Sequence, residues 1–425
     1  MSNTALLRVN PELQRCLWLE LTPARLVLMP SLLAIGLAGL HLVGTENLAE
    51  WVQYLLFFLL VLWGSRLAAD AFVEEVAQGT WDVQRLSASN PWAMAVGKIF
   101  GGTAYVWYGA ILCLAVLPAV PGAVNGRDAV MTVVSGVTAQ ATALLVVLVL
   151  HGFDATRRRG STTLAQILGV VVAVPSLGSG AALGLVQGWG DALRWYGAEF
   201  PMADFTLVHQ LVLTVWLVIA VAWMIRLQLG HAPSPWPYVA FAVYLAAFAV
   251  GFLFVGDLVA PLPVVTGVAA LVVAAATYGA LLASPMQVAD IKRLMRATNW
   301  ARRWQLVPAW VLTAALAVGL GALTVTLGGR EWTLAAAALA LFLRDIALVA
   351  AVRLLSGRRT ALLLCVLALL LYGLLPEVTT AGGGALRAWI FPEMGAAPIT
   401  LIGPWAQTLA ALLLARLAWI RHRGA

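Results

Sequence analysis

The sequence predicts an all-α integral membrane protein, a polytopic bundle of transmembrane helices. Hydrophobic residues make up 62% of its 425 residues and charged residues 11%, whereas charged residues account for about 25% of an ordinary soluble protein. The mean hydropathy is +0.91. The apolar stretches are continuous instead of alternating, and a helix satisfies its own backbone hydrogen bonds within a bilayer. These observations exclude a water-soluble globular fold.

About twelve apolar stretches approach the roughly 20 residues that cross a hydrocarbon core about 30 Å thick. The stretch at 162–186 is the weakest candidate, because Pro175 and the run Gly178-Ser179-Gly180 would kink or break a helix. We expect spans near residues 25–44, 50–68, 98–120, 129–150, 162–186, 207–226, 237–256, 262–284, 306–327, 333–352, 360–376 and 399–419.

The distribution of basic residues predicts that both termini lie in the cytoplasm. With the N-terminus inside, the outer side receives only Arg127, Arg194, Arg330 and Arg387 of the 26 Lys and Arg, and Arg344 falls within a span. Such a bias toward the inner side orients membrane proteins. It also accounts for the net charge of +7, so no nucleic-acid partner is needed. We expect a multi-pass protein in contact with the lipid bilayer.

Three segments outside the membrane spans have a distinct organisation: an N-terminal helix, a hairpin and a second helix. An amphipathic N-terminal helix at 1–24 precedes a first six-span half at 25–226, which includes a cytoplasmic hairpin at 69–97. The second half, 237–425, includes an amphipathic cytoplasmic helix at 285–305 with Trp residues at headgroup level. The polar face of that helix would carry Lys292, Arg296, Asn299 and Arg303.

The hairpin at 69–97 gathers acidic residues in a chain that has few of them. If the second span continues as a helix, Asp70, Glu74 and Gln78 recur at i, i+4 steps and share one face with Asp82. Gly79 interrupts this helix, and we expect Thr80 to cap a second short helix through Arg85 and Leu86. The chain then re-enters the membrane at Asn90-Pro91, because proline suits the first turn of a helix.

Three short runs in and after this hairpin form a pattern: Glu74-Glu75-Val76-Ala77-Gln78-Gly79-Thr80-Trp81, Leu86-Ser87-Ala88-Ser89 and Gly97-Lys98. The pattern resembles the membrane permease subunits of type-2 ABC exporters. Those subunits have acidic residues, a Gly-Thr pair, a short helix and a Gly-Lys entry to the next span, at the same place after an amphipathic N-terminal helix. The resemblance covers roughly the first quarter of the chain.

The resemblance implies a transport subunit of a bacterial inner (cytoplasmic) membrane that is not itself an enzyme. The N-terminal helix would be the elbow helix, and the hairpin would carry a coupling helix that docks in a groove of a separate ABC ATP-binding subunit. ATP would bind to that partner, so we expect no cofactor and no metal in this chain. The resemblance assigns docking and coupling to Glu74, Glu75, Gly79, Thr80, Trp81, Asp82 and Arg85, with the docking surface continuing to Ser89.

The rest of the chain departs from the family's usual six spans. The second half has no Glu-Glu…Gly-Thr copy, only a basic run from Arg353 to Arg359 after the tenth span. Gly97-Lys98 lacks the earlier glycine of a phosphate-binding loop and is followed by Ile99, so ATP hydrolysis requires a partner. Twelve spans could form a whole translocation unit or half of one, which leaves a second permease copy open.

Two other classes of function stay open. A proton- or ion-coupled secondary transporter would keep ionisable groups at mid-membrane, and Asp345 beside Arg344 is the best such candidate. Adjacent residues on a helix point about 100° apart, so these two need not pair with each other. They could serve gating or an ion pair between helices. A membrane assembly or structural factor is the other alternative.

A membrane enzyme is disfavoured by the pattern of reactive residues. The five histidines and three cysteines are scattered without metal-ligand spacing, and no serine nucleophile motif occurs. The sparse intramembrane charge favours a hydrophobic or amphipathic cargo over a small hydrophilic ion.

Overall fold

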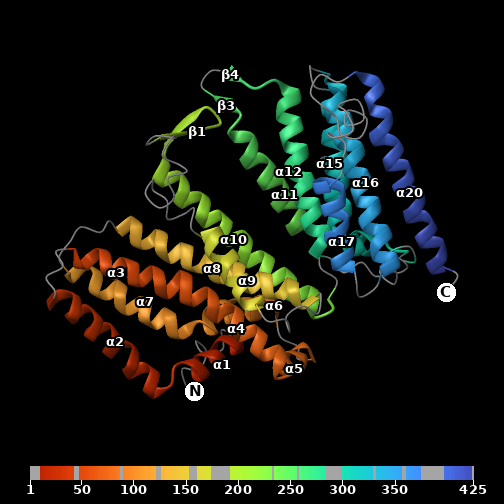
Figure 1. Ribbon diagram of the computed structural model, residues 1–425. Helices are drawn as coiled ribbons and strands as arrows, with labels where there is room; N and C mark the ends of the chain where they lie inside the picture. The colour runs from red at the N-terminus through yellow and green to blue at the C-terminus, as the bar shows by residue number, and fades with distance from the viewer. Residues whose placement is uncertain are drawn as a thin grey trace. The chain divides into compact units, whose positions relative to one another are not determined.

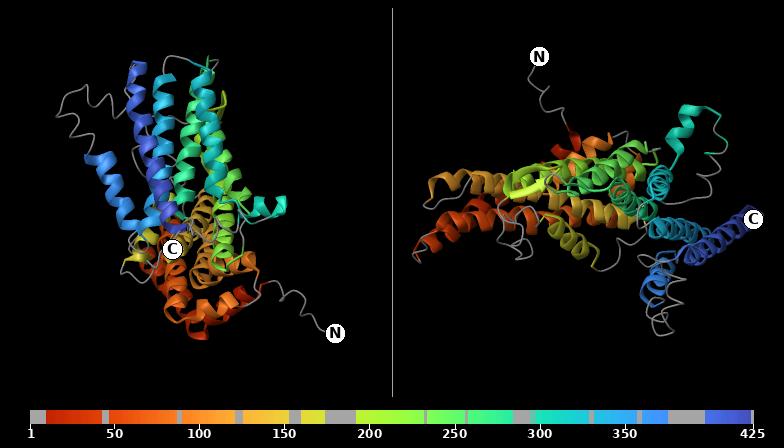
Figure 2. Two further views of the ribbon diagram at one scale, coloured as in Figure 1. Left: turned by 90° about the vertical axis from the view of Figure 1, so that its right-hand side faces the viewer. Right: turned by 90° about the horizontal axis from the view of Figure 1, so that it is seen from above.

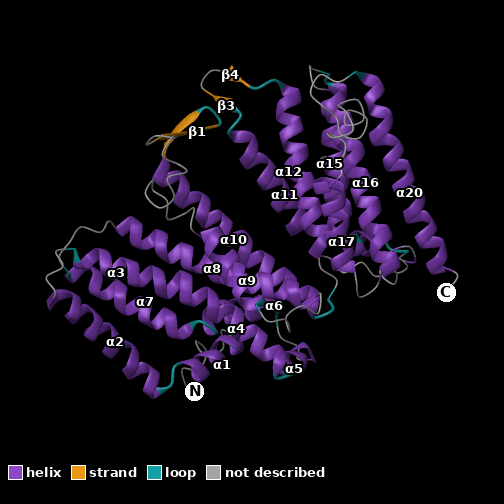
Figure 3. Cartoon of the chain, viewed as in Figure 1, coloured by secondary structure: helices purple, strands orange, loops and turns teal. Residues whose placement is uncertain are grey.

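The computed structural model confirms the all-α fold class. Its strands are short pieces between helices (Figure 3). The structure describes residues 10–42, 47–86, 90–120, 126–152, 160–173, 192–231, 234–255, 258–283, 294, 296, 298–328, 332–356, 360–374 and 397–423.

The chain divides into two compact units. Unit 1 comprises Met1–Leu193 and Glu199–Pro233, and unit 2 comprises Arg194–Ala198 and Ser234–Ala425. The division after Pro233 falls between helices α10 (Met202–Gln228) and α11 (Trp236–Gly251). Each unit has its own hydrophobic core.

Within the described residues, unit 1 starts with a short helix and continues with long apolar helices, of which α2, α3, α7 and α8 lie side by side (Figure 1). In chain order its elements before α10 are α1 (Pro11–Glu20), α2 (Pro23–Leu42), α3 (Leu48–Phe57), η2 (Phe58–Trp63), α4 (Gly64–Ala77), α5 (Thr80–Leu86), α6 (Pro91–Val96), η3 (Gly97–Gly101), α7 (Ala104–Val116), η4 (Leu117–Ala119), α8 (Gly126–Gly152) and α9 (Ser161–Ala173).

The core of unit 1 contains a buried cluster of hydrogen-bonded polar groups beside the π-helical segment η2. Leu56, Leu59 and Leu60 pack inward around η2. Gln140 of α8 is fully buried and donates to the carbonyl of Leu60 at 3.0 Å, while its own oxygen accepts from Thr103 at 3.1 Å. A π-turn leaves backbone groups without their ordinary helical partners, so this amide replaces the missing interaction.

Unit 2 is built from long helices that lie side by side, with Val273, Ala317 and Phe342 in a core between α12, α15 and α16 (Figure 1). Strands β1 (Ala192–Trp195) and β2 (Ala198–Pro201) lie at the unit boundary. The elements after α11 are β3 (Phe254–Val255), β4 (Leu258–Val259), α12 (Leu262–Ala283), α14 (Trp300–Leu306), α15 (Ala309–Thr326), α16 (Trp332–Ser356), α17 (Thr360–Ala368), η7 (Leu369–Leu374), η8 (Pro398–Leu401) and α20 (Ile402–Arg423).

Within the described residues, eight helices are long and apolar enough to cross a membrane. The pair Pro91–Gly101 and Ala104–Ala119 bends by 59° and would make a ninth if it forms one span. The spans expected near 162–186 and 237–256 correspond to the shorter apolar helices α9 and α11, and residues 174–186 lie outside the described part. Most of the helix expected at 285–305 also lies outside it; α14 is the described end.

Candidate functional site

The hairpin between the second and third predicted spans has the helix–break–helix form expected from its sequence. Helix α4 continues to Ala77, and Gly79 then adopts φ +72°, a left-handed conformation that glycine reaches without a steric penalty. Helix α5 follows directly. Asn90 then caps α6 by accepting from the Trp92 N–H at 3.0 Å, with Pro91 in the first turn.

Two residues of α5 play different parts from those expected. The Thr80 hydroxyl does not cap α5; it donates to the carbonyl of Glu75 at 3.0 Å and so ties the new helix to the end of α4. The side chain of Trp81 is 1% exposed and packs edge-on against Phe72, with ring centroids 5.1 Å apart. Trp81 therefore anchors α5 against α4 instead of facing outward.

The other residues assigned to docking divide into an outward group and one inward residue. The Glu75 side chain is 15% exposed and points into a cluster of charges. The pair Asp82–Arg85 lies on the surface at 3.6 Å. Apolar side chains share the outer surface of α5, where Val83 is 69% and Leu86 90% exposed. Residues 87–89 lie outside the described part. The outward group of assigned residues is Glu74, Gly79, Thr80, Asp82 and Arg85.

Lys98 is the centre of the inward cluster. Its side chain is 5% exposed, and its Nζ donates to Glu75 Oε2, to Gln84 Oε1 at 3.1 Å and to Glu12 Oε1 at 3.4 Å. It also lies 5.2 Å from the centre of the Trp81 ring, within reach of a cation–π interaction. One ammonium thus joins α1, α4, α5 and the start of the third predicted span.

Arg15 completes the cluster from α1. Its guanidinium donates to both carboxylate oxygens of Glu12, at 2.8 and 3.1 Å, and to Glu75 Oε1 at 2.7 Å. Two cations therefore face two carboxylates. Burial raises the pKa of Glu12, but the hydrogen bond from Arg15 and the charges of Lys98 and Arg15 outweigh it, so the pKa lies below its ordinary value. Hydrogen bonding to Glu12 raises the pKa of Arg15.

Close backbone contact places α1 on this cluster. A Cβ atom on Gly97 would lie 2.6 Å from Glu12 Cγ, and one on Gly101 would lie 2.6 Å from Cys16 Cβ. Asn10 caps α1 and donates from Nδ2 to the carbonyl of Ala93 at 2.7 Å. Sequence reasoning missed the Glu12–Lys98 contact. The spacing Gly97-x-x-x-Gly101 was the available signal, because it permits close helix packing in membranes.

The second candidate, Arg344 and Asp345 on α16, lies buried within unit 2. The guanidinium donates to Asp345 Oδ1 from Nε at 2.9 Å and from Nη2 at 2.8 Å. The two adjacent residues therefore do pair, because the long arginine side chain folds back along the helix. The ion pair lies within one helix, whereas the sequence left open a role in gating or an ion pair between helices.

Neutral groups from three other helices complete this network. Tyr278 of α12 donates to Asp345 Oδ2 at 2.9 Å, and Tyr372 of η7 donates to the same oxygen. Gln407 of α20 accepts from Arg344 Nη1 at 2.6 Å. Burying charge in a membrane is costly unless it is paired. Because the charges of Arg344 and Asp345 cancel, the network holds these helices together without burying an unpaired charge.

Among the residues that the structure describes, no group of three or more His, Cys, Asp or Glu side chains could hold a metal ion. Comparison of the chain with protein-family models, with curated proteins and with solved structures finds no match.

Proposed function

We propose that this chain is the membrane-spanning permease of an ATP-driven ABC transporter, working as an exporter with a separate ATP-hydrolysing subunit. The observation that carries the proposal is α5: it is fixed from within by Trp81 and Lys98, yet its outer surface exposes Val83 and Leu86. Exposed apolar side chains beside surface charges are typical of a protein contact. The similarity of the hairpin to type-2 exporters supplies the identity of the partner.

In this proposal α5 transmits the motion of the ATPase to the membrane helices. Because Lys98 and Glu75 join α5 to α1, α4 and the third predicted span, a displacement of α5 would move these elements together. The ATP cycle in the partner would then drive alternating access. The proposal includes about twelve spans, cytoplasmic termini, a bacterial inner membrane and a hydrophobic or amphipathic cargo.

A pull-down in mild detergent from native membranes tests the proposal. Wild type is compared with Val83→Asp/Leu86→Asp, which changes the outer surface of α5 and leaves the Lys98 cluster intact. Glu50→Lys, an exposed acid at the start of α3, is the matched control. We expect an ATP-binding subunit to copurify with wild type and the control, and to be lost in the double variant at unchanged gel-filtration behaviour.

If wild type retains no ATPase under conditions that preserve a known ABC complex, the proposal is wrong. The alternative is then a proton- or ion-coupled secondary transporter, with Asp345 as the coupling residue, or a membrane assembly factor. If the protein is a secondary transporter, Asp345→Asn should abolish gradient-driven transport. If it is an assembly factor, the same substitution should leave the assembly of partner proteins unchanged.

A further inference from the structure

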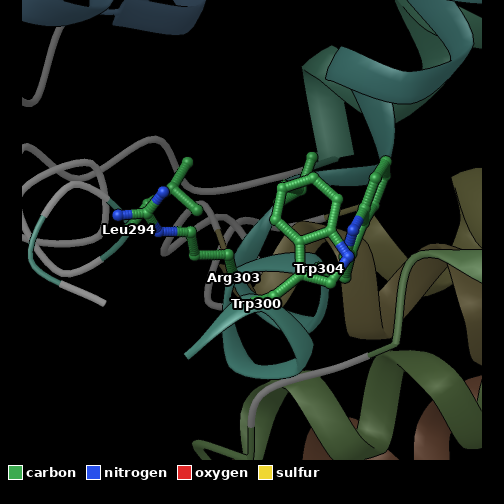
Figure 4. A pocket seen from close by; sticks show the side chains of 5 residues that line it. Leu294, Trp300, Arg303 and Trp304 are labelled. Atoms are coloured by element: carbon green, nitrogen blue, oxygen red, sulfur yellow. The ribbon is translucent and has the colours of Figure 1, made fainter. Parts of the chain in front are cut away.

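A small pocket in unit 2 lies beside α14 (Figure 4). Its volume is about 390 Å³. Most of its lining is aromatic or aliphatic, and one charged side chain contributes to it. The lining residues are Leu294, Trp300, Arg303, Trp304 and Val307.

Tryptophan rings form one wall of this pocket. Trp300 and Trp304 meet edge-on with centroids 5.3 Å apart, and Trp304 stacks on Trp236 of α11 at 6.0 Å. Trp300 is 68% exposed. Helix α14, teal in Figure 2, lies across the direction of the long helices of its unit in both views. Tryptophans on such a helix are typical of the boundary between headgroups and acyl chains.

The sequence around α14 is strongly basic. The segment 285–305 contains a single acid, Asp290, against five basic residues. Of these, Arg296 and Arg303 have exposed side chains in the described part. Such clusters beside a membrane helix attract anionic lipid, with about 1 kcal/mol for each basic residue. The five basic residues are Lys292, Arg293, Arg296, Arg302 and Arg303.

We infer that this pocket binds the headgroup of an anionic glycerophospholipid. Arg303 holds the phosphate by charge-assisted hydrogen bonds, and Trp300 and Trp304 pack against the glycerol and the first acyl carbons. The arginine in the lining disfavours a ligand with a net positive charge, and the apolar wall disfavours a fully hydrated inorganic anion. The inference is independent of the proposed transport function, because no step of it uses the hairpin or the ATPase.

Native mass spectrometry of the delipidated full-length protein tests this inference. The protein is titrated with phosphatidylglycerol or with phosphatidylcholine of the same acyl chains, and bound lipid is counted. We expect phosphatidylglycerol to bind more tightly, and Arg303→Gln to weaken it roughly tenfold, the loss expected for one hydrogen bond to a charged group. Arg421→Gln, an exposed arginine near the end of α20, is the control and should bind as wild type does.

Two further arms identify the source of the phosphate and separate binding from folding. Soluble glycerol phosphate should not compete at the same concentration, since it lacks the acyl carbons that contact Trp304. Arg303→Lys keeps the charge and should retain part of the binding. Equal binding of the two lipids, an unchanged affinity in Arg303→Gln, or full competition by glycerol phosphate would each overturn the inference.

Discussion

Lys98 is a buried ammonium that faces two carboxylates on different helices. Replacing it by methionine keeps the aliphatic volume but leaves Glu75 and Glu12, whose side chains are 15% and 12% exposed, with Arg15 as their remaining cation. Removing one partner of a buried pair costs about 3 to 5 kcal/mol. We therefore expect Lys98→Met to lower the free energy of unfolding by about 3 kcal/mol, measured by thermal unfolding in detergent.

An exposed pair on the same hairpin provides the comparison. Asp82 and Arg85 lie 3.6 Å apart with side chains 77% and 46% exposed, and such pairs contribute less than about 1 kcal/mol. Arg85→Gln should consequently leave the melting temperature almost unchanged. If the two variants were destabilised equally, the Lys98 cluster would not be the structural anchor described above.

The lowered pKa of Glu12 predicts that the stabilisation of the fold by this cluster depends on pH. Because its pKa in the folded protein lies below the ordinary value of 4.5, the charged carboxylate stabilises the fold above that pH. This contribution falls as the pH drops below about 4.5 and is lost as the folded-state pKa is passed. We expect Glu12→Gln to melt below wild type at about pH 6, and the difference to shrink at about pH 4. A difference that grows on acidification would contradict the assignment.

At the scale of elements, the position of α1 depends on the absence of a side chain at Gly97. A Cβ there would lie 2.6 Å from Glu12 Cγ and 3.0 Å from the backbone nitrogen of Leu13. A backbone atom cannot rotate away, so Gly97→Val should separate α1 from the start of the third predicted span. Cys16 reports this separation, because burial raises its thiol pKa to about 11.

The measurement uses a variant in which Cys16 is the only cysteine, made by replacing Cys113 and Cys365 with serine. We expect maleimide to label Cys16 more than tenfold faster in Gly97→Val, since a free thiol has a pKa of about 8.5 and forms far more thiolate at neutral pH. Gly36→Val in α2, where a Cβ would meet nothing within 4 Å, is the control. Equal labelling in all three proteins would show that α1 is not held by this contact.

Local signals predicted the elements of the hairpin, whereas long-range contacts were not predictable. Gly79 and Asn90-Pro91 act on their own neighbours, so the break and the new helix start follow from backbone chemistry. The bond from Lys98 to Glu12 joins residues 86 positions apart. Nothing in a single sequence states which carboxylate will meet a distant ammonium, so the inward role of Glu75 became visible only in three dimensions.

At the scale of the whole molecule, span prediction was most secure where a single helix carries the apolar stretch. The long helices α8, α10 and α16 coincide with predicted spans. Helices α9 and α11 are shorter, with 13 and 16 residues, and at 1.5 Å per residue they cover only about 20 and 24 Å of a core about 30 Å thick. Hydropathy alone does not locate the ends of such helices, so the exact number of crossings stays a prediction.

The connection between α11 and α12 predicts how this part of unit 2 crosses the membrane. The two helices pack against each other and are joined by the β3–β4 hairpin, in which Phe254 pairs with Val259. The start of α11 therefore lies beside the end of α12, and the stack of Trp236 on Trp304 joins the same end to α14. Both α11 and α12 should cross the membrane, despite the shortness of α11.

Single cysteines in a cysteine-free protein test this topology with a membrane-impermeant maleimide applied to intact cells. We expect His231→Cys and Asn299→Cys to be protected together, because the basic residues around 292–303 favour the cytoplasmic side. Ala260→Cys, which follows β4 at the opposite end of α11 and α12, should be labelled. If position 231 were labelled while 299 stayed protected, α11 would not span, and the even number of crossings that places both termini inside would be wrong.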